Sequence, residues 1–331
     1  MKNNLISVII VSWNGKRWIK KCLDSIHKQS YRNIEVIFVD NNSTDDSVEY
    51  VKSKYPDVKT IINNENYGFG VANNIGIERS KGDILFLLNN DTAMPRDTIQ
   101  KLLECKTDLG LNIVGPRLLN TEGVDPLGGR FMQSDPLGSP GVDPVRLFYI
   151  EGCALMIDKM DITKLKRFDE KYFMYAEDID LCWRAHLYGM KLGICEDAKV
   201  IHYGGGSSLK TQLRKGFRHT SSFSRRLWVE SYTLRNILKN YSRLTLVLVI
   251  PIYLALALLE SSIYLLTGNT RLFSVAFRAI AWNLVNIGDT IKKRQIVQSN
   301  RVTSDAYVLS KMYVGSNKIK AFLQYGIPQF K

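Results

Sequence analysis

Apolar positions in the first hundred residues fall into two spacings. Mainly apolar runs cover residues 6–11, 34–39 and 84–88, the first two rich in β-branched residues, and a shorter strand is expected at 58–62. Strands that are apolar on both faces are typical of the middle of a parallel sheet, and helical spacing of apolar residues between the runs indicates crossover helices. The pattern therefore predicts an α/β fold with a doubly wound sheet, whose ligands bind beyond the carboxyl ends of the strands.

The helices between these strands are predicted from their spacing and start signals. Ile19, Cys22 and Ile26 recur at helical spacing, and Ser43-x-x-Asp46 is typical of a capping box that opens a second helix. A third helix is expected over residues 71–80.

The second hundred residues are less regular. Residues 121–146 hold five of the chain's Gly and four of its nine Pro, which predicts a long irregular loop. Further on we expect a strand at 154–157 and a helix at 179–188. Two short strands are expected after that helix, at residues 191–194 and 199–202.

Charge divides the chain into two parts. The formal net charge is +13, but residues 207–331 hold 19 Lys/Arg against 4 Asp/Glu, leaving 26 and 28 for residues 1–206. We therefore expect a domain over 1–206 and a basic helical region over 207–331. Because this region surrounds the most apolar stretch of the chain, we interpret its charge as attraction to an anionic membrane surface rather than to nucleic acid.

The apolar stretch, residues 244–266, is 23 residues long and so could cross a bilayer. Pro251 and Glu260 interrupt it, and basic residues flank both of its ends, whereas a span carries them mainly on its cytoplasmic side. The pattern favours an interfacial or re-entrant helical pair, with a single span and a buried core helix left open. The odd number of cysteines and the absence of a signal-peptide pattern predict location at the cytoplasmic face of the cell membrane.

Carboxylates follow two of the predicted strands. Asp40 ends the second strand and could bind a base or ribose, although it could equally cap the next helix. Asp91 follows the strand at 84–88 and could hold a metal ion, or simply belong to a turn before Pro95.

Two further segments could take part in chemistry. Glu177 and Asp178 follow an aromatic run, where a partly desolvated carboxylate becomes a stronger base, although acids also favour the first turn of a helix. His202 ends a strand before a Gly-rich segment and is a candidate metal ligand or a structural histidine. The Gly68-x-Gly70 pattern lacks the third glycine of a dinucleotide fingerprint, so we reject that interpretation.

In this order, the segments resemble the inverting family 2 glycosyltransferases of the GT-A fold, and most of all its branch of bacterial rhamnosyltransferases. The residues that carry the resemblance are Ser7–Asn14, Val39–Ser43, Asn66–Gly70 with Asn73–Gly76, Asn89–Asp91, Glu177–Leu181 and His202.

The resemblance implies a GT-A mixed sheet and a hexosyltransferase activity. It implies catalysis by Asp178 as general base with Glu177 beside it, and a metal site of Asp91 and His202. The implied donor-binding residues are Ser12, Asn14, Asp40, Asn42, Asn66, Gly68, Asn73, Asn74 and Asn90.

The resemblance also implies a divalent cation, Mg²⁺ or Mn²⁺, although Asn89-Asn90-Asp91 stands where many relatives have two acids. The expected donor is dTDP-rhamnose, with a UDP-sugar such as UDP-galactofuranose or UDP-galactose second. The expected acceptor is a polyprenyl-linked saccharide of cell-surface polysaccharide assembly. A non-catalytic, nucleotide-binding membrane scaffold remains the alternative from another class of protein.

Overall fold

A computed structural model describes residues 4–204, 220–325 and 329–330. It contains two compact units. Unit 1 comprises Met1–Gly129, Ile150–Leu181 and Met190–Ser208, and unit 2 comprises Arg130–Tyr149, Cys182–Gly189 and Leu209–Lys331. Most of residues 1–206 thus fall in unit 1, while two short segments before residue 190 join unit 2. The boundary predicted at 206/207 lies outside the described residues.

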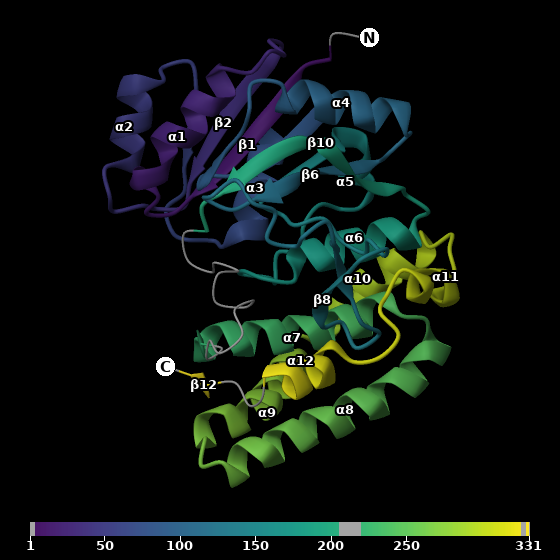
Figure 1. Ribbon diagram of the computed structural model, residues 1–331. Coiled ribbons are helices and arrows are strands. Elements are labelled where there is room, and N and C mark those ends of the chain that lie inside the picture. Colours follow the sequence, from purple (N-terminus) through teal and green to yellow (C-terminus); the bar gives the residue numbers. More distant parts are fainter. Residues whose placement is uncertain (1–3, 205–219, 326–328, 331) are drawn as a thin grey trace. The chain divides into compact units, whose positions relative to one another are not determined.

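Unit 1 is built on an eight-stranded mixed sheet with strand order β3-β2-β1-β4-β9-β6-β10-β5 (Figure 1). Strands β3, β2, β1 and β4 pair in parallel, β9 is antiparallel to both β4 and β6, and β10 returns parallel to β6. The strands are β1 (Ile6–Ser12), β2 (Ile34–Asp40), β3 (Lys59–Ile62), β4 (Ile84–Asn89), β5 (Thr92–Ala93), β6 (Ile113–Leu119), β9 (Ala154–Asp158) and β10 (Leu192–His202).

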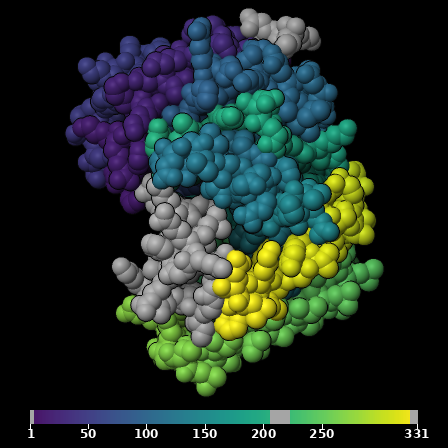
Figure 2. Space-filling view, viewed as in Figure 1, coloured from purple at the N-terminus to yellow at the C-terminus, as the bar shows by residue number. Residues whose placement is uncertain are grey.

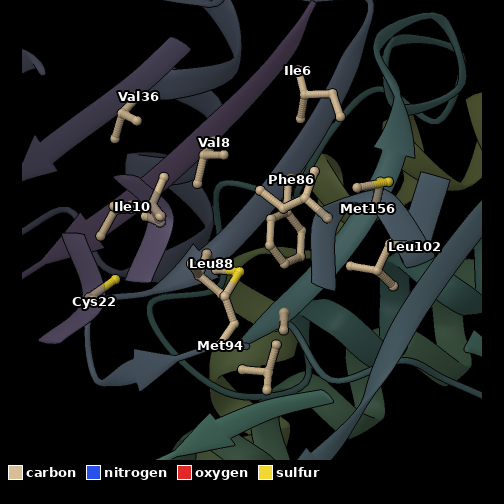
Figure 3. Packing of buried hydrophobic residues seen from close by; sticks show 14 of the residues in the cluster. Ile6, Val8, Ile10, Cys22, Val36, Phe86, Leu88, Met94, Leu102 and Met156 are labelled. Atoms are coloured by element: carbon tan, nitrogen blue, oxygen red, sulfur yellow. The ribbon is translucent and has the colours of Figure 1, made fainter. Parts of the chain in front are cut away.

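The two faces of this sheet are covered by different helices. Ile6, Val8 and Ile10 are every second residue of β1 and point to the same face of the sheet (Figure 3). There they pack with residues of α1 and α4. On the other face, α3 approaches so closely that a Cβ at Gly76 would lie 2.4 Å from Ile9 Cγ2. The helices of unit 1 are α1 (Lys16–His27), α2 (Ser47–Lys54), α3 (Phe69–Arg79), α4 (Thr98–Asp108), α5 (Lys159–Lys164) and the start of α6 (Glu177–Leu187).

The predicted parallel strands and the mixed sheet are confirmed, and three local predictions are wrong. The second helix begins at Ser47 rather than at a capping box, because the Ser43 hydroxyl accepts a hydrogen bond from Asn14 N instead. Residues 191–194 and 199–202 belong to one strand, β10, with a bulge between Cys195 and Lys199. The segment 121–146 contains a hairpin, β7 (Phe131–Ser134) and β8 (Pro140–Asp143).

Unit 2 is mainly helical and holds the apolar stretch as one continuous helix, α8, with Pro251 inside it. Strand β11 (Thr220–Ser221) pairs in parallel with β12 (Gln329–Phe330). The helices are α7 (Phe223–Asn240), α8 (Arg243–Leu266), α9 (Thr270–Val285), α10 (Ile287–Ser299), α11 (Asp305–Ser310) and α12 (Asn317–Tyr325).

Candidate active site

The carboxyl ends of β1, β2 and β4 bring three predicted segments to one edge of the sheet. Ser12 pairs in register with Asp40, and Val11 pairs with Asn89 on the other side of β1. The segment Asn90-Asp91 therefore starts beside Ser12, although 78 residues separate Asn90 from it in sequence. Parallel strand order alone assembles this part of the site.

The Asp40 carboxylate is buried at this edge with one oxygen available. Its Oδ2 accepts a hydrogen bond from Ser43 N at 2.9 Å, while its Oδ1 is buried with no hydrogen-bond partner among the described residues. An unsatisfied buried carboxylate oxygen is costly, so it indicates a place for a donor group of a ligand.

Asn14 and Asn42 lie in the left-handed region, with φ of 51° and 62°, and Asn14 Oδ1 accepts from Thr44 N at 2.8 Å.

Asn90 precedes Asp91, and its amide has a partner of its own. Asn90 Nδ2 donates to Ser12 Oγ at 2.8 Å, a bond that a carboxylate could not donate. Gly15 lies against the same amide, since a Cβ there would be 1.8 Å from Asn90 Nδ2. Asn90 therefore joins the ends of β1 and β4 next to Asp91.

Asp91 and His202 lie side by side, at the end of β4 and the end of β10. His202 Nε2 is 3.2 Å from Asp91 Oδ1. The antiparallel pairing of His202 in β10 with Thr92 in β5 holds the two residues next to each other. Burial lowers the pKa of His202, but the neighbouring Cys153 thiol and the Asp91 carboxylate outweigh it and raise the pKa to about 11. At neutral pH His202 therefore carries a proton while no cation is bound, and the pair offers one oxygen and one nitrogen ligand to a cation that displaces this proton.

These two side chains fit a divalent cation only with help from a substrate. Among the described residues, no group of three or more His, Cys, Asp and Glu side chains could hold a metal ion. Mg²⁺ and Mn²⁺ keep several ligands from water and substrate phosphates, so two protein ligands suffice when a diphosphate supplies the others.

Glu177 and Asp178 start helix α6 after a strained backbone segment. Tyr175 and Ala176 have φ of 75° and 63°. Residues other than glycine rarely adopt this backbone conformation, and those that do are concentrated at functional sites. Asp178 accepts from Gly152 N at 3.1 Å and from Ile179 N at 2.8 Å.

Both acids have altered proton affinity. Burial and the charge of Asp178 raise the pKa of Glu177 to about 8, and Glu177 Oε2 is buried with no hydrogen-bond partner among the described residues. Burial also raises the pKa of Asp178, although the Gly152 and Ile179 N–H groups oppose it. A carboxylate whose pKa is raised is the better general base.

The segment Glu151-Gly152-Cys153, which sequence reasoning missed, connects the two groups of side chains. Gly152 N donates to Asp178, the Cys153 thiol contacts the His202 ring, and Cys153 O accepts from Asn89 N at 2.8 Å. Burial raises the pKa of Glu151 to about 7, with His202 lowering it and Asp178 raising it further. The predicted base and the predicted metal ligands thus share one site.

Tyr203 and Trp18 form a second feature that sequence reasoning missed. The Tyr203 ring stacks on Trp18 with centroids 4.9 Å apart, and Lys21 Nζ lies 4.6 Å from the Tyr203 ring centroid. Tyr203 N also donates to Asp91 O at 2.8 Å. The stack therefore fixes the backbone next to His202, and no spacing in the sequence indicated it.

The loop before α3 packs closely against the segment before α6 through its backbone. Gly68 has φ of 82°, and a Cβ there would lie 2.2 Å from Phe173 O, so only glycine fits. Asn66 Oδ1 accepts from Gly68 N, and Asn73 Nδ2 donates to Phe69 O. Both ends of the Asn74 amide bind the Phe168 backbone, so in this structure Asn74 joins α3 to the segment before α6.

The fold is of the GT-A type: a mixed sheet with carboxylates at the carboxyl ends of its parallel strands. Residues 7–162 match the family Glycosyl transferase family 2, which supports a family 2 glycosyltransferase domain over this part of the chain.

Curated relatives agree with that domain. The hexosyltransferase Agl10 of low-salt glycan biosynthesis in Haloferax volcanii is 27% identical over 212 residues, 60% of this chain and 66% of that protein. The amylovoran biosynthesis glycosyltransferase AmsB of Erwinia amylovora is 29% identical over 203 residues, 58% of this chain and 67% of that protein. The match to Agl10 thus spans less than two thirds of that relative's length.

Solved structures share the fold at low sequence identity. GalNAc-T7 in complex with UDP, GalNAc and Mn²⁺ aligns with a TM-score of 0.67 at 14% identity, covering 97% of this chain and 58% of that one. TarS residues 1–349 from S. aureus align with a TM-score of 0.51 at 15% identity, covering 89% and 90%. These neighbours confirm the GT-A fold.

Proposed function

We propose that the protein is an inverting, cation-dependent hexosyltransferase that transfers a sugar from a nucleotide-diphosphate donor to a lipid-linked saccharide. The observation that carries the proposal is the meeting of Asp178 and the Asp91–His202 pair around the Glu151–Cys153 segment. A family 2 domain and hexosyltransferase relatives support the class of reaction.

Each side chain of the site has a role in this reaction. Asp91 and His202 would hold a divalent cation, which would neutralise charge on the leaving diphosphate when bound. Asp178 takes the proton of the acceptor hydroxyl. The acceptor oxygen forms a bond to the anomeric carbon of the donor sugar while the bond from that carbon to the diphosphate oxygen breaks. One carboxylate base suffices because the leaving group is already good, unlike glycoside hydrolysis with its two carboxyls.

The unpartnered Asp40 Oδ1 would accept a hydrogen bond from the base or ribose of the donor. We favour dTDP-rhamnose on the resemblance to the rhamnosyltransferase branch, with a UDP-sugar second. The neighbours are complexed with UDP in GalNAc-T7 and with GDP-mannose in the mannosyltransferase PcManGT, both together with Mn²⁺. Mn²⁺ and Mg²⁺ are therefore the cations to test.

The acceptor side of the proposal rests on polysaccharide biosynthesis in the relatives and on the basic, apolar C-terminal region of this chain. A catalytic domain held at the cytoplasmic face of the cell membrane meets a polyprenyl-linked acceptor at a high effective concentration.

A donor panel tests the function. Purified full-length protein is incubated with a short polyprenyl-diphosphate-linked saccharide and dTDP-rhamnose, UDP-galactose, UDP-galactofuranose or GDP-mannose, with Mg²⁺, Mn²⁺ or EDTA. We expect release of one nucleotide diphosphate that EDTA abolishes. Cation-dependent donor binding without transfer to any acceptor would instead favour the non-catalytic scaffold.

A further inference from the structure

One side of helix α8 exposes an uninterrupted apolar surface, here called the outer face of α8. Its exposed positions recur at helical spacing, and among the large side chains exposure runs from 50% at Leu265 to 87% at Leu266. Ser262 is the only polar residue of this face, which contains no charge. The outer face consists of Leu244, Val247, Leu248, Pro251, Ile252, Ala255, Leu258, Leu259, Ser262, Leu265 and Leu266.

The opposite side of α8 is packed and polar. Tyr253, Ser261 and Tyr264 are buried there, and Tyr253 Oη lies 3.3 Å from Glu230 Oε2 of α7. Tyr264 Oη donates to Glu260 at 3.0 Å. A helix surrounded by lipid has no such one-sided set of hydroxyl partners, so this side of α8 belongs to the interior of unit 2.

Glu260, the acid inside the apolar stretch, belongs to a cluster of four charges. Arg226 of α7 donates to Glu260 and lies 3.1 Å from Glu230. Lys318 of α12 is 2.6 Å from Glu230 and 3.2 Å from Glu260. Helices α7, α8 and α12 are thus joined by two acids and two bases, and α8 could not enter a bilayer alone without separating them.

Helix α9 also remains with α8. A turn at Thr267–Asn269, with Gly268 at φ of 76°, leads from α8 into α9 (Figure 1). Tyr264 of α8 packs with Leu272 and Val275 of α9. Arg271 and Arg278 of α9 are exposed. Crossing a membrane with α8 would therefore carry arginines of α9 into or across the hydrocarbon, which is costly.

We propose that α8 lies in the plane of the membrane and inserts its outer face into one leaflet, instead of spanning the bilayer. The 24 residues of α8 make a helix about 36 Å long at 1.5 Å per residue, and this whole length then lies parallel to the membrane surface. In Figure 2, green atoms of the α8–α9 pair lie on the molecular surface.

Charge selects an anionic lipid surface as the occupant of this face. Arg243 at the start of α8 and Arg271 just after its end are both exposed, so positive charge marks both ends of the helix rather than one. A second copy of the chain would bring these arginines near their own counterparts. This inference deepens the membrane part of the proposed function and does not depend on the sugar chemistry.

Vesicle flotation tests the outer face. Full-length protein is mixed with vesicles of phosphatidylcholine alone or with 30 mol% phosphatidylglycerol. We expect binding to the anionic vesicles, and at least about a tenfold loss in the quadruple variant Val247→Gln, Leu248→Gln, Leu258→Gln, Leu259→Gln. The matched control is Leu109→Gln with Met160→Gln, two side chains of unit 1 that are 60% and 84% exposed.

All variants are checked by circular dichroism, thermal unfolding and release of nucleotide diphosphate with a soluble acceptor analogue, so that lost transfer and lost membrane binding are distinguished. Unchanged flotation of the folded quadruple variant would overturn the proposal. So would a wild-type dimer in solution that this variant makes monomeric, without vesicle binding.

Labelling from the two sides of a membrane separates a helix in the plane from a span. In a Cys105→Ser background, Arg243→Cys and Thr267→Cys mark the two ends of α8, since the other four cysteines are buried. In bacterial cells we expect an impermeant maleimide to label both ends in inverted vesicles and neither in spheroplasts. One end labelled from each side would show a span and refute the proposal.

Discussion

Two buried glutamates, one in each unit, have opposite environments. Glu177 of unit 1 is 7% exposed and has a pKa raised to about 8, because burial and Asp178 disfavour its charge. Glu230 of unit 2 is 4% exposed, yet Lys318 and Arg226 outweigh burial and lower its pKa to about 2. Burial alone therefore does not identify a functional acid: Glu230 has cations as partners, whereas one oxygen of Glu177 has no hydrogen-bond partner in the described structure.

The comparison predicts that acids of the site control activity and acids of unit 2 control stability. Its sharpest test is Asp178→Asn, which removes the base and keeps one acceptor oxygen for Gly152 N while the bond from Ile179 N is lost. We expect kcat to fall by roughly 1,000-fold, with the Kd for the donor changed by less than about twofold. Steady-state kinetics and calorimetric titration of the donor measure the two quantities.

Asp97→Asn is the control for Asp178→Asn, because Asp97 is a half-exposed acid of unit 1 paired with Lys101. It should leave both constants unchanged. Equal losses of kcat and donor affinity in Asp178→Asn would make this carboxylate structural and remove the contrast with Glu230.

Glu230→Gln should give the reverse result, a loss of stability with little loss of intrinsic activity. It leaves Arg226 and Lys318 with Glu260 as their remaining acid in the cluster, and a broken buried ion pair typically costs about 3 kcal/mol. Urea unfolding measures the loss. Asp46→Asn, which breaks an exposed pair with Lys16, should cost under about 1 kcal/mol, and an equal cost in both variants would contradict the comparison.

Much of unit 1 could be predicted because its central strands are mainly apolar runs. Strands β1, β2 and β4 gave clear signals, and their parallel order brings Asp40 and Asp91 to one edge. Strand β6 was missed since Gly115-Pro116 interrupts its apolar run, and β10 was divided because Glu196-Asp197 lies at its bulge. The apolar pattern of a strand fails to predict it where polar, Gly or Pro residues interrupt the strand and pairing with neighbouring strands stabilises the interruption.

The remaining features depend on contacts between distant segments. Gly152 lies 26 residues from Asp178, which its N–H binds, so nothing local distinguishes Glu151-Gly152-Cys153 from any residues before a strand. Likewise, composition left the state of the apolar stretch open because Glu260 finds its partners in Arg226 and Lys318, 34 and 58 residues away. Local sequence identifies candidate functional residues, and pairing between distant segments decides which of them have partners.

The Asp91–His202 pair provides a further test of the site. Asp91→Ala and His202→Ala should each raise the cation concentration for half-maximal activity by roughly 100-fold, because each removes one of two protein ligands. Activity is titrated with Mn²⁺ and Mg²⁺ at fixed donor. An unchanged cation response in both variants would assign the pair a structural role, like that of the Glu230 cluster.

The smallest expected effect concerns the stability of the metal-free protein as a function of pH. Glu177 binds its proton more tightly in the folded chain, with a pKa of about 8 against 4.5, so its contribution is complete below pH 4.5 and is lost as pH rises toward 8. Glu177→Gln cannot lose a proton, and should therefore gain stability relative to the wild type in urea unfolding as the pH is raised from 5 to 8.5.

Asp97→Asn again provides the control, because the pKa of Asp97 is lowered below 3.8 by Lys101 and does not titrate between pH 5 and 8.5. Its difference from the wild type should stay constant over that range. If the Glu177→Gln and wild-type curves also ran parallel, Glu177 would be charged in the folded protein near neutral pH. A cation partner would then have to be present, and the distinction between Glu177 and Glu230 would be lost.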